Sequence, residues 1–237
     1  IKFSNFYRKD ITQISDFFSY DNLKNKIKKK AKLITSIAMF YDLDDPIKFA
    51  KDIEMLLDDE GIWHFEQSYM PSMIKNVSYD TICHEHLEYY SLTSVKYILD
   101  KVGLKIIDIE FNDINGGSFA LSVAKKKSSL KEEKKLINWL LAKEKVLKVN
   151  ESKTFINFFK KCKKQKKILV DLLKNLKDMK KKVYGYGAST KGNVILQFCK
   201  IDSKLINYIG EVNKYKFNRY TPGTKIKIIS EQKLRKL

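Results

Sequence analysis

The sequence predicts an α/β fold in which a helical segment separates two α/β segments. Apolar, β-branched runs of strand length alternate with helical patterns before residue 125 and again after residue 182. Between these positions the chain has no glycine or proline, and its apolar residues recur every three or four positions. We therefore expect a first α/β domain at 1–124, a helical connector at 125–182 and a C-terminal α/β unit at 183–237.

The first segment predicts a helix followed by a βαβ unit. Apolar residues at 11, 14, 17 and 18 share one helical face, and the run at 33–40 has the character of a strand buried on both faces of a parallel sheet. Asp44 or Asp45 can cap a helix that starts at Pro46 and that Gly61 stops. A second strand follows at 61–67.

The carboxyl ends of parallel strands meet at one edge of a sheet, where ligands bind in such folds. The two predicted strands end at Tyr41 and Asp42 and at Glu66 and Gln67. We therefore expect these residues at the mouth of one cleft.

Ser91 is expected to cap a helix that ends before Gly103, and two strands at 104–112 and 118–126 then form a hairpin around NDINGG. The segment at 125–182 predicts two amphipathic helices that separate near Asn150, which can cap the second. These helices could form a coiled-coil arm or a connector packed on the flanking domains.

The last 55 residues predict strands at VYGYG, LINYIGE and KIKII, a helix at NVILQFC and a short helix from Ser230. The turn GYGASTKG lacks the third glycine of a dinucleotide fingerprint, because Thr190 stands there. It still places Ser189 and Lys191 at a helix N-terminus, which favours a phosphate.

Charge and cysteine usage limit the class of protein. The chain carries 47 Lys and Arg against 28 Asp and Glu, which favours an anionic partner. The lysines are scattered, and no RNP-like motif or zinc-finger spacing occurs, so we do not expect nucleic acid. Three widely spaced cysteines indicate a reducing compartment. With no signal-peptide pattern and no run of about 18 apolar residues, a soluble, cytoplasmic protein without a membrane partner is expected.

The three histidines of the chain, His64, His84 and His86, gather in one window, and two of them flank Glu85. Histidine titrates near physiological pH, so this window predicts proton transfer or metal binding. The HxH pair could bind a metal with Glu66 or Asp80, but no further histidine or cysteine pair completes a site. We therefore expect no metal.

Four stretches resemble one family: GIWHFEQSYMP, YDTICHEHLEYYSL, LKIIDIEFNDINGGSF and YGYGASTKGNVILQF with RYTPGTKIKI. In this order they resemble the SAM-dependent sugar C-methyltransferases, which methylate a carbon of a nucleotide-linked keto-sugar. The resemblance implies the later strands of a class I, Rossmann-like methyltransferase sheet, followed by the helical connector and a small Rossmann-like unit that binds the nucleotide-sugar. It also implies S-adenosyl-L-methionine (SAM) as cofactor.

The resemblance implies that His86 is the catalytic base, oriented by Glu85 or His84, and that a phenol stabilises the enolate oxygen. The expected catalytic residues are His86, Glu85, His84 and Tyr79. The expected cofactor-binding residues are Ala38, Met39, Phe40 and Tyr41. The expected substrate-binding residues are Glu66, Gln67, Tyr89, Asn115, Gly116, Gly117, Ser118, Gly187, Ser189, Lys191 and Arg219. Two positions depart from the family, since Cys83 stands where it often has tyrosine and Asn115 where it often has histidine.

The glycine-rich turn and the acidic residue that hold SAM in class I methyltransferases have no counterpart before residue 33, and the first glycine is Gly61. We therefore expect a chain that starts inside the catalytic domain, has an unpaired sheet edge and binds SAM weakly or not at all by itself. A non-catalytic subunit that binds nucleotide-sugars is the alternative.

Overall fold

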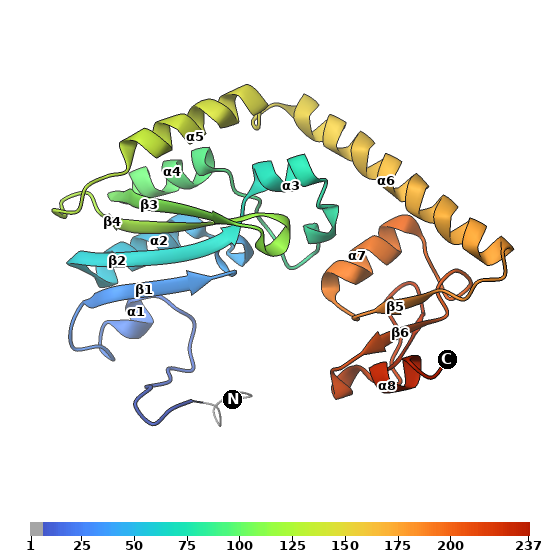
Figure 1. Ribbon diagram of the computed structural model, residues 1–237. Coiled ribbons are helices and arrows are strands. Elements are labelled where there is room, and N and C mark those ends of the chain that lie inside the picture. The colour runs from blue at the N-terminus through green and yellow to red at the C-terminus, as the bar shows by residue number, and fades with distance from the viewer. Residues whose placement is uncertain (1–6) are drawn as a thin grey trace. The chain divides into compact units, whose positions relative to one another are not determined.

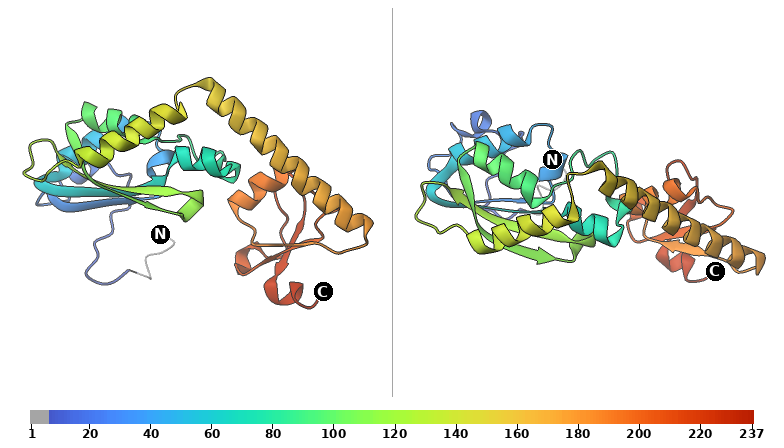
Figure 2. Two further views of the ribbon diagram at one scale, coloured as in Figure 1. Left: turned by 45° about the horizontal axis from the view of Figure 1, so that its top comes forward. Right: turned by 90° about the horizontal axis from the view of Figure 1, so that it is seen from above.

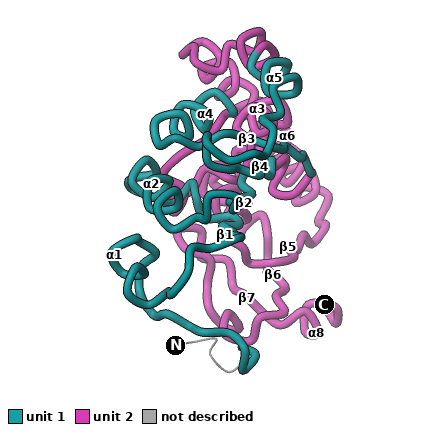
Figure 3. The backbone as a smooth tube through the Cα atoms, turned by 90° about the vertical axis from the view of Figure 1, so that its left-hand side faces the viewer, with its two compact units in different colours: residues 1–67, 92–112, 119–141 teal, residues 68–91, 113–118, 142–237 magenta. Residues whose placement is uncertain are grey.

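The computed structural model describes residues 7–237 and divides the chain into two compact units. Figure 3 colours unit 1, residues 1–67, 92–112 and 119–141, apart from unit 2, residues 68–91, 113–118 and 142–237. These units interleave along the chain, whereas the three predicted domains follow it in order. Residues 68–91, which carry the histidine motif, belong with the C-terminal part.

Unit 1 is built on a four-stranded sheet (Figure 1) with the order β1-β2-β4-β3. Its strands are β1 (Ala31–Ile37), β2 (Leu57–Ser68), β3 (Leu104–Asn112) and β4 (Ser118–Lys125). β1 runs parallel to β2, with Ile34 opposite Trp63. The predicted α/β class, the βαβ unit and the hairpin are confirmed.

The prediction that β1 is buried on both faces is wrong, because Ser36 is its only buried residue. Its side chains at Leu33 and Ile37 are 61% and 54% exposed. The β-branched run that predicts a strand is present, and this strand lies at the edge of the sheet, where it pairs with β2.

Two of the predicted helix boundaries in unit 1 are confirmed. α2 (Pro46–Leu56) begins after Asp45, whose side chain accepts a hydrogen bond from the Lys48 amide. α4 (Leu92–Lys101) ends before Gly103, which has φ +78°. α2 contacts α4, which packs on β3 (Figure 2).

Two details of unit 1 differ from the prediction. The only helix among residues 7–30 is the short α1 (Tyr20–Leu23), capped by Ser19, so the helix predicted around residues 11–18 is absent. Gly61 does not stop a helix, because β2 already begins at Leu57. A Cβ at Gly61 would lie 2.7 Å from the carbonyl oxygen of Ala31, so the glycine permits close pairing of β2 with β1.

Aromatic rings form the centre of unit 1. Phe40, at the start of a 3-10 turn (Phe40–Asp42), is fully buried. Its ring lies 6.0, 5.6 and 5.3 Å from the rings of Phe49, Trp63 and Phe65. The core thus fixes the chain immediately after β1.

Unit 2 contains a parallel three-stranded sheet of order β5-β6-β7. Its strands are β5 (Tyr184–Tyr186), β6 (Tyr208–Glu211) and β7 (Lys227–Ser230). Its helices are α3 (Met70–Asn76), α6 (Ser152–Asp178), α7 (Thr190–Cys199) and α8 (Glu231–Leu234), with 3-10 turns η3 (Tyr79–Thr81), η4 (Ile114–Gly116) and η5 (Lys214–Lys216). The strands and helices predicted for the last 55 residues are confirmed.

The predicted pair of helices between the two α/β segments is confirmed as α5 (Lys134–Leu147) and α6, although Asn150 does not cap α6. Inside unit 2, α6 packs into two apolar clusters. Its Leu173 joins Ile209 in one cluster, and its Phe158 joins Met73 in the other. This packing is that of a connector rather than of a free coiled-coil arm.

Among residues 7–237, none of the helices is both long and apolar enough to cross a membrane.

Candidate functional site

The histidine motif lies in a loop of unit 2 between η3 and α4. Hydrogen bonds hold both ends of this loop: the Thr81 hydroxyl donates to the Ser78 carbonyl oxygen (2.9 Å), and the Met70 amide donates to the Tyr90 carbonyl oxygen (2.9 Å). Within the loop, the His86 amide donates to the Cys83 carbonyl oxygen at 3.2 Å. The motif is thus a turned loop with fixed ends.

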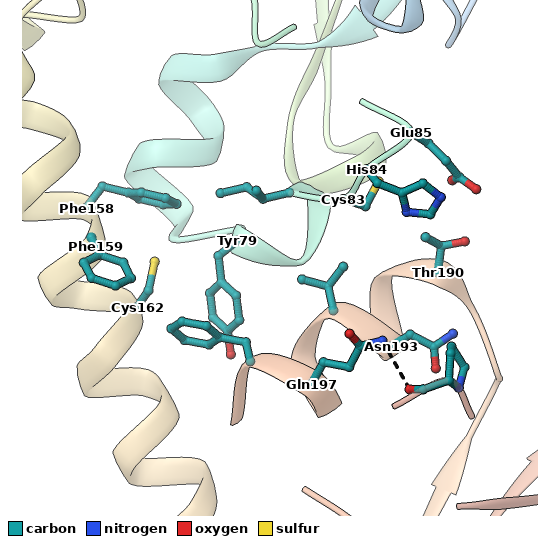
Figure 4. A pocket seen from close by; sticks show the side chains of 14 residues that line it. Tyr79, Cys83, His84, Glu85, Phe158, Phe159, Cys162, Thr190, Asn193 and Gln197 are labelled. Carbon is teal, nitrogen blue, oxygen red and sulfur yellow. Dashed lines mark hydrogen bonds between the residues drawn. The ribbon is translucent and has the colours of Figure 1, made fainter. Parts of the chain in front are cut away.

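This loop borders a cavity of about 770 Å³ in unit 2 (Figure 4). Its lining includes the catalytic candidates Tyr79, His84 and Glu85, together with Ile82 and Cys83. The His84 and Glu85 side chains are exposed, whereas His86 is half-buried and is not among the lining residues. The structure therefore places His84, rather than His86, on the cavity.

Two helices supply most of the remaining wall. From α6 come Phe158, Phe159 and Cys162, and from α7 come Thr190, Asn193, Val194, Gln197 and Phe198. Pro222 completes the lining. Most of these side chains are apolar, so the cavity suits a ligand with an apolar body and few polar groups.

The tyrosines around the loop are neutral phenols. Tyr79 is buried, its hydroxyl lies 3.6 Å from Cys199 Sγ, and burial followed by this hydrogen bond raises the pKa of Tyr79 well above its usual value. Burial also raises the pKa values of half-buried Tyr89 and of buried Tyr90. Phenols of this kind donate hydrogen bonds and do not act as bases at neutral pH.

The glycine-opened turn between β5 and α7 brings together several predicted substrate residues. Gly187 has φ +84°, and Ser189 caps α7 by accepting a hydrogen bond from the Gly192 amide at 3.0 Å. Lys191 Nζ donates to Asn115 Oδ1 at 2.6 Å. The cationic side chain at the start of α7 is thus tied to the NDINGG turn.

Packing explains the other residues of the NDINGG turn. A Cβ at Gly116 would lie 2.5 Å from Ser78 Oγ, and one at Gly117 would lie 2.5 Å from Ser72 Cβ. Ser118 is buried, and its hydroxyl donates to the carbonyl oxygen of Ile114 at 2.9 Å. The two glycines therefore permit close contact with neighbouring serines.

Glu211, which was not predicted as a site residue, stabilises the turn between β5 and α7. Its carboxylate accepts hydrogen bonds from the amides of Ala188 (2.9 Å), Val212 (2.8 Å) and Asn213 (3.0 Å). Lys216 Nζ lies 3.6 Å from the carboxylate and donates to the Ala188 carbonyl oxygen at 2.7 Å. The Asn213 amide is the largest cause that lowers the pKa of Glu211. The sequence did contain a signal for this residue: Glu211 is an acidic residue at the end of β6, the next strand after the glycine turn.

Arg219, by contrast, is exposed and does not line the cavity. Its backbone carbonyl oxygen accepts a hydrogen bond from the Ile228 amide at 2.8 Å, which fixes the segment before Pro222.

The predicted cofactor residues lie in unit 1, at the end of β1. Ala38 is exposed, has φ +52° and donates its amide to the Glu66 carbonyl oxygen at 2.8 Å. Met39 and Glu66 are half-buried, whereas Phe40 and Tyr41 belong to the core. Only backbone atoms of Phe40 are therefore suited to meet a ligand.

Gln67, at the end of β2, is 1% exposed, and neither atom of its amide has a hydrogen-bond partner among the described residues. A buried amide without partners is costly, and a bound polar ligand is one way to satisfy it. The ends of β1 and β2 thus fit a ligand with polar groups, such as SAM, through Gln67 and the backbone at Ala38.

The third histidine, His64, has a structural environment. It lies on β2, half-buried, with Nδ1 3.1 Å from Ser122 Oγ. Among residues 7–237, no group of three or more His, Cys, Asp or Glu side chains is arranged to hold a metal ion.

Sequence reasoning missed the α7 wall of the cavity. Thr190, Asn193 and Gln197 follow the glycine turn at intervals of three and four residues, which places them on one helical face. That spacing was a usable signal, but nothing in the sequence says which face of α7 meets the histidine loop.

Several solved structures are similar to parts of the chain. SAM-dependent methyltransferases from Aquifex aeolicus (TM-score 0.35, 15% identity, covering 52% of this chain and 58% of that one) and from Clostridium acetobutylicum ATCC 824 (0.34, 15%, 42% and 60%) are two of them. LepI in complex with SAM is another (0.35, 13%, 41% and 27%). At these TM-scores the similarities carry no argument.

Among curated proteins, the C-methyltransferase NovU from Streptomyces niveus is 27% identical over 202 residues, covering 85% of this chain and 48% of NovU. The chain thus spans about half the length of this curated relative. The family model of a methyltransferase domain matches residues 1–109, and that of the C-methyltransferase C-terminal domain matches residues 113–237, more than half of the chain. The second match covers the α6 and α7 walls of the cavity together with the glycine turn and Glu211. The chain therefore belongs to the C-methyltransferase family.

Proposed function

We propose that the protein takes part in SAM-dependent C-methylation of a nucleotide-linked 4-keto-deoxysugar. The observation that supports this most is the cavity of unit 2, where the loop that carries His84, Glu85 and His86 meets the first turns of α7. A loop with general bases and a helix N-terminus suited to phosphate are the two features that such a substrate needs.

Methylation of a sugar carbon needs a carbon nucleophile, which forms most readily beside a carbonyl group. In the proposed reaction the reacting carbon lies beside the loop and outside the cavity, because His86 is not among the lining residues. His86 takes the proton from this carbon, which is next to the ketone, and the electron pair moves to the carbonyl oxygen to give an enolate. A positioned base of this kind contributes about 10² to 10⁴ in rate. His84 and Glu85 orient this base and face the substrate.

A phenol donates a hydrogen bond to the enolate oxygen and stabilises its charge. Tyr79 and Tyr89 are the candidates for this role. Because the Tyr79 hydroxyl is directed at Cys199, half-buried Tyr89 is the better placed of the two.

When bound, SAM would supply an electrophilic methyl group for transfer to this carbon. Gln67 and the backbone from Ala38 to Tyr41 would hold it at the ends of β1 and β2. In unit 2, Ser189, Lys191 and Arg219 bind the diphosphate, and the backbone of Gly187 lets it approach the turn. Asn115 holds the Lys191 side chain, and Gly116, Gly117 and Ser118 shape the turn beneath it.

The test separates proton removal from methyl transfer. The full-length protein is given a dTDP- or GDP-linked 4-keto sugar, first in D₂O without SAM and then with labelled SAM. His86→Ala should slow both deuterium uptake beside the ketone and methyl transfer by at least about 100-fold. His64→Ala is the matched control and should leave both rates nearly unchanged, because His64 contacts Ser122 on the sheet.

Undiminished deuterium uptake in His86→Ala would remove the proposed base. Binding of the sugar nucleotide without any methyl transfer by the wild type would instead favour a non-catalytic subunit that binds nucleotide-sugars.

A further inference from the structure

The start of α3 joins the two segments that carry the candidate site. The first amides of a helix have no acceptor within the helix, so they are available to other segments. Here the Tyr69 amide donates to the Gly117 carbonyl oxygen at 3.0 Å, and the Met70 amide donates to the Tyr90 carbonyl oxygen at 2.9 Å. The next residue, Pro71, has no amide hydrogen. The start of α3 thus holds both the NDINGG turn and the end of the histidine loop.

A buried hydrogen bond fixes this start of α3 to α5. The Tyr69 hydroxyl donates to Glu144 Oε1 at 2.7 Å, and both residues are buried, with Glu144 only 1% exposed. Burial, followed by the bond to Glu144, raises the pKa of Tyr69 far above its usual value, so the phenol remains the donor. All these groups belong to unit 2. Tyr69 therefore holds the turn with its amide and is itself held by its side chain.

A pair of this kind is not what stability alone selects. Burial of a carboxyl group is costly, and apolar side chains of similar size in its place are often as stable or more stable. A hydrogen bond, unlike apolar contact, also sets the direction of the groups that it joins. This directional contact lies where the two site segments meet, which indicates a role in their orientation.

We propose that Glu144 and Tyr69 are positioning residues for the removal of the proton. Through the amides at the start of α3 they hold the histidine loop in the orientation from which His86 reaches the substrate. The inference rests on the proposed function, because it assigns supporting residues to the same base.

The pair acts on the rate of the reaction rather than on substrate binding. Neither Tyr69 nor Glu144 is among the residues that line the cavity. The NDINGG turn has a second anchor on α3, because the Asn76 side chain donates to the Gly116 carbonyl oxygen at 2.9 Å. We therefore expect the turn, and with it substrate binding, to tolerate loss of the pair.

The experiment measures deuterium uptake from D₂O into the 4-keto sugar nucleotide by the full-length protein without SAM. Tyr69→Phe removes the donor and should lower kcat for this uptake by about tenfold or more, because a misplaced base slows the reaction. KM should stay within about twofold, because binding is retained. Glu144→Gln keeps an acceptor for the Tyr69 hydroxyl and should retain most of the rate. Tyr97→Phe is the matched control, since Tyr97 is exposed on α4.

A double variant separates orientation from stability. In Tyr69→Phe combined with Glu144→Met, apolar groups of similar size replace both partners, which is nearly neutral for folding. Urea unfolding should therefore give a free energy close to that of the wild type, even if Tyr69→Phe alone folds poorly. Because apolar contact is non-directional, kcat should stay about tenfold lower. Recovery of kcat together with stability would show that the pair is only structural and would overturn the inference.

Hydrogen exchange distinguishes failure of this inference from failure of the proposed function. The amides of residues 69 and 70 should exchange about tenfold faster in Tyr69→Phe and in the double variant, the factor for one hydrogen bond. They should exchange at the wild-type rate in Tyr97→Phe. Unchanged protection of these amides would overturn the positioning pair and leave the proposed function standing. Absence of deuterium uptake with the wild-type protein would overturn the proposed proton removal itself, and this inference with it.

Discussion

Replacement of Glu211 by glutamine should loosen the turn between β5 and α7. One carboxylate oxygen accepts from the Val212 and Asn213 amides, and the other accepts from the Ala188 amide and faces Lys216. Glutamine keeps one acceptor oxygen, so its NH₂ group faces an amide donor at one of these two places.

The magnitude follows from these contacts. A buried N–H without an acceptor costs about 1 to 3 kcal/mol, and the bonds that remain lose the assistance of the negative charge. We expect a loss of about 3 kcal/mol in the free energy of local opening. Since about 1.4 kcal/mol corresponds to a factor of ten, the Ala188 amide should exchange its hydrogen roughly 100-fold faster.

Hydrogen exchange measured by mass spectrometry suits this test, because both tryptophans, Trp63 and Trp139, belong to unit 1 and do not report on the turn. Glu151→Gln is the matched control. Glu151 pairs with Lys148 at the protein surface just before α6, and its replacement should leave exchange at Ala188 unchanged. Unchanged protection of the turn in Glu211→Gln would refute the assigned role of the carboxylate.

Three further predictions concern pH and packing. Hydrogen bonds lower the pKa of Glu211 in the folded state. The stabilisation that they give is therefore present above the unfolded-state pKa of about 4.3 and is lost as the pH falls through the folded-state pKa. Protection of the turn from hydrogen exchange should fall at low pH in the wild type and should not fall in Glu211→Gln. Gly117→Ala, with φ +120° and Ser72 Cβ 2.5 Å away, should cost about 3 kcal/mol in urea unfolding, against about 1 kcal/mol for Gly103→Ala, which has open space; equal costs would contradict the packing role. Phe40→Ala should cost about 3 to 5 kcal/mol by tryptophan fluorescence, and a loss below 1 kcal/mol would show that the ring is not central to the core.

Local signals predicted most of the elements. Asp45 and Pro46 predicted the start of α2 because a side-chain cap and a fixed φ act within one turn. The sequence placed Ser189 near the N-terminus of a helix predicted at 193–199, and α7 begins about one turn earlier, at Thr190, because Ser189 caps it. Gly103 marked the end of α4, because a glycine with positive φ can end a helix locally.

Predictions that depended on distant contacts were less successful. The spacing of residues 11–18 suggests a helix, but Asp16 accepts hydrogen bonds from the Phe17 amide and the Asn22 side chain, and Phe18 packs on Phe49 at 5.0 Å. Local side-chain bonds and one tertiary contact therefore outweigh the helical pattern. β1 has the composition of a central strand, yet sheet order alone decides how many neighbours cover it.

The same limit applies to the candidate site. The motif of His84, Glu85 and His86 and the glycine turn are each contiguous in the sequence, so the sequence reveals them directly. Gln197 and Glu211 take their partners from other elements: Gln197 donates to the Pro222 carbonyl oxygen, and Glu211 accepts from the Ala188 amide, which lies 23 positions before it. No pattern along the chain records those partners.

The interleaving of the two units has a consequence for engineering this family. The segment before His84 packs against α6, because Met73 and Tyr79 share an apolar cluster with Phe158. A chimaera joined near residue 125 would therefore pack the loop with the histidine motif from one parent against α6 from the other parent. Exchanges of C-terminal halves between relatives should destabilise this loop unless residues 68–91 are exchanged with them.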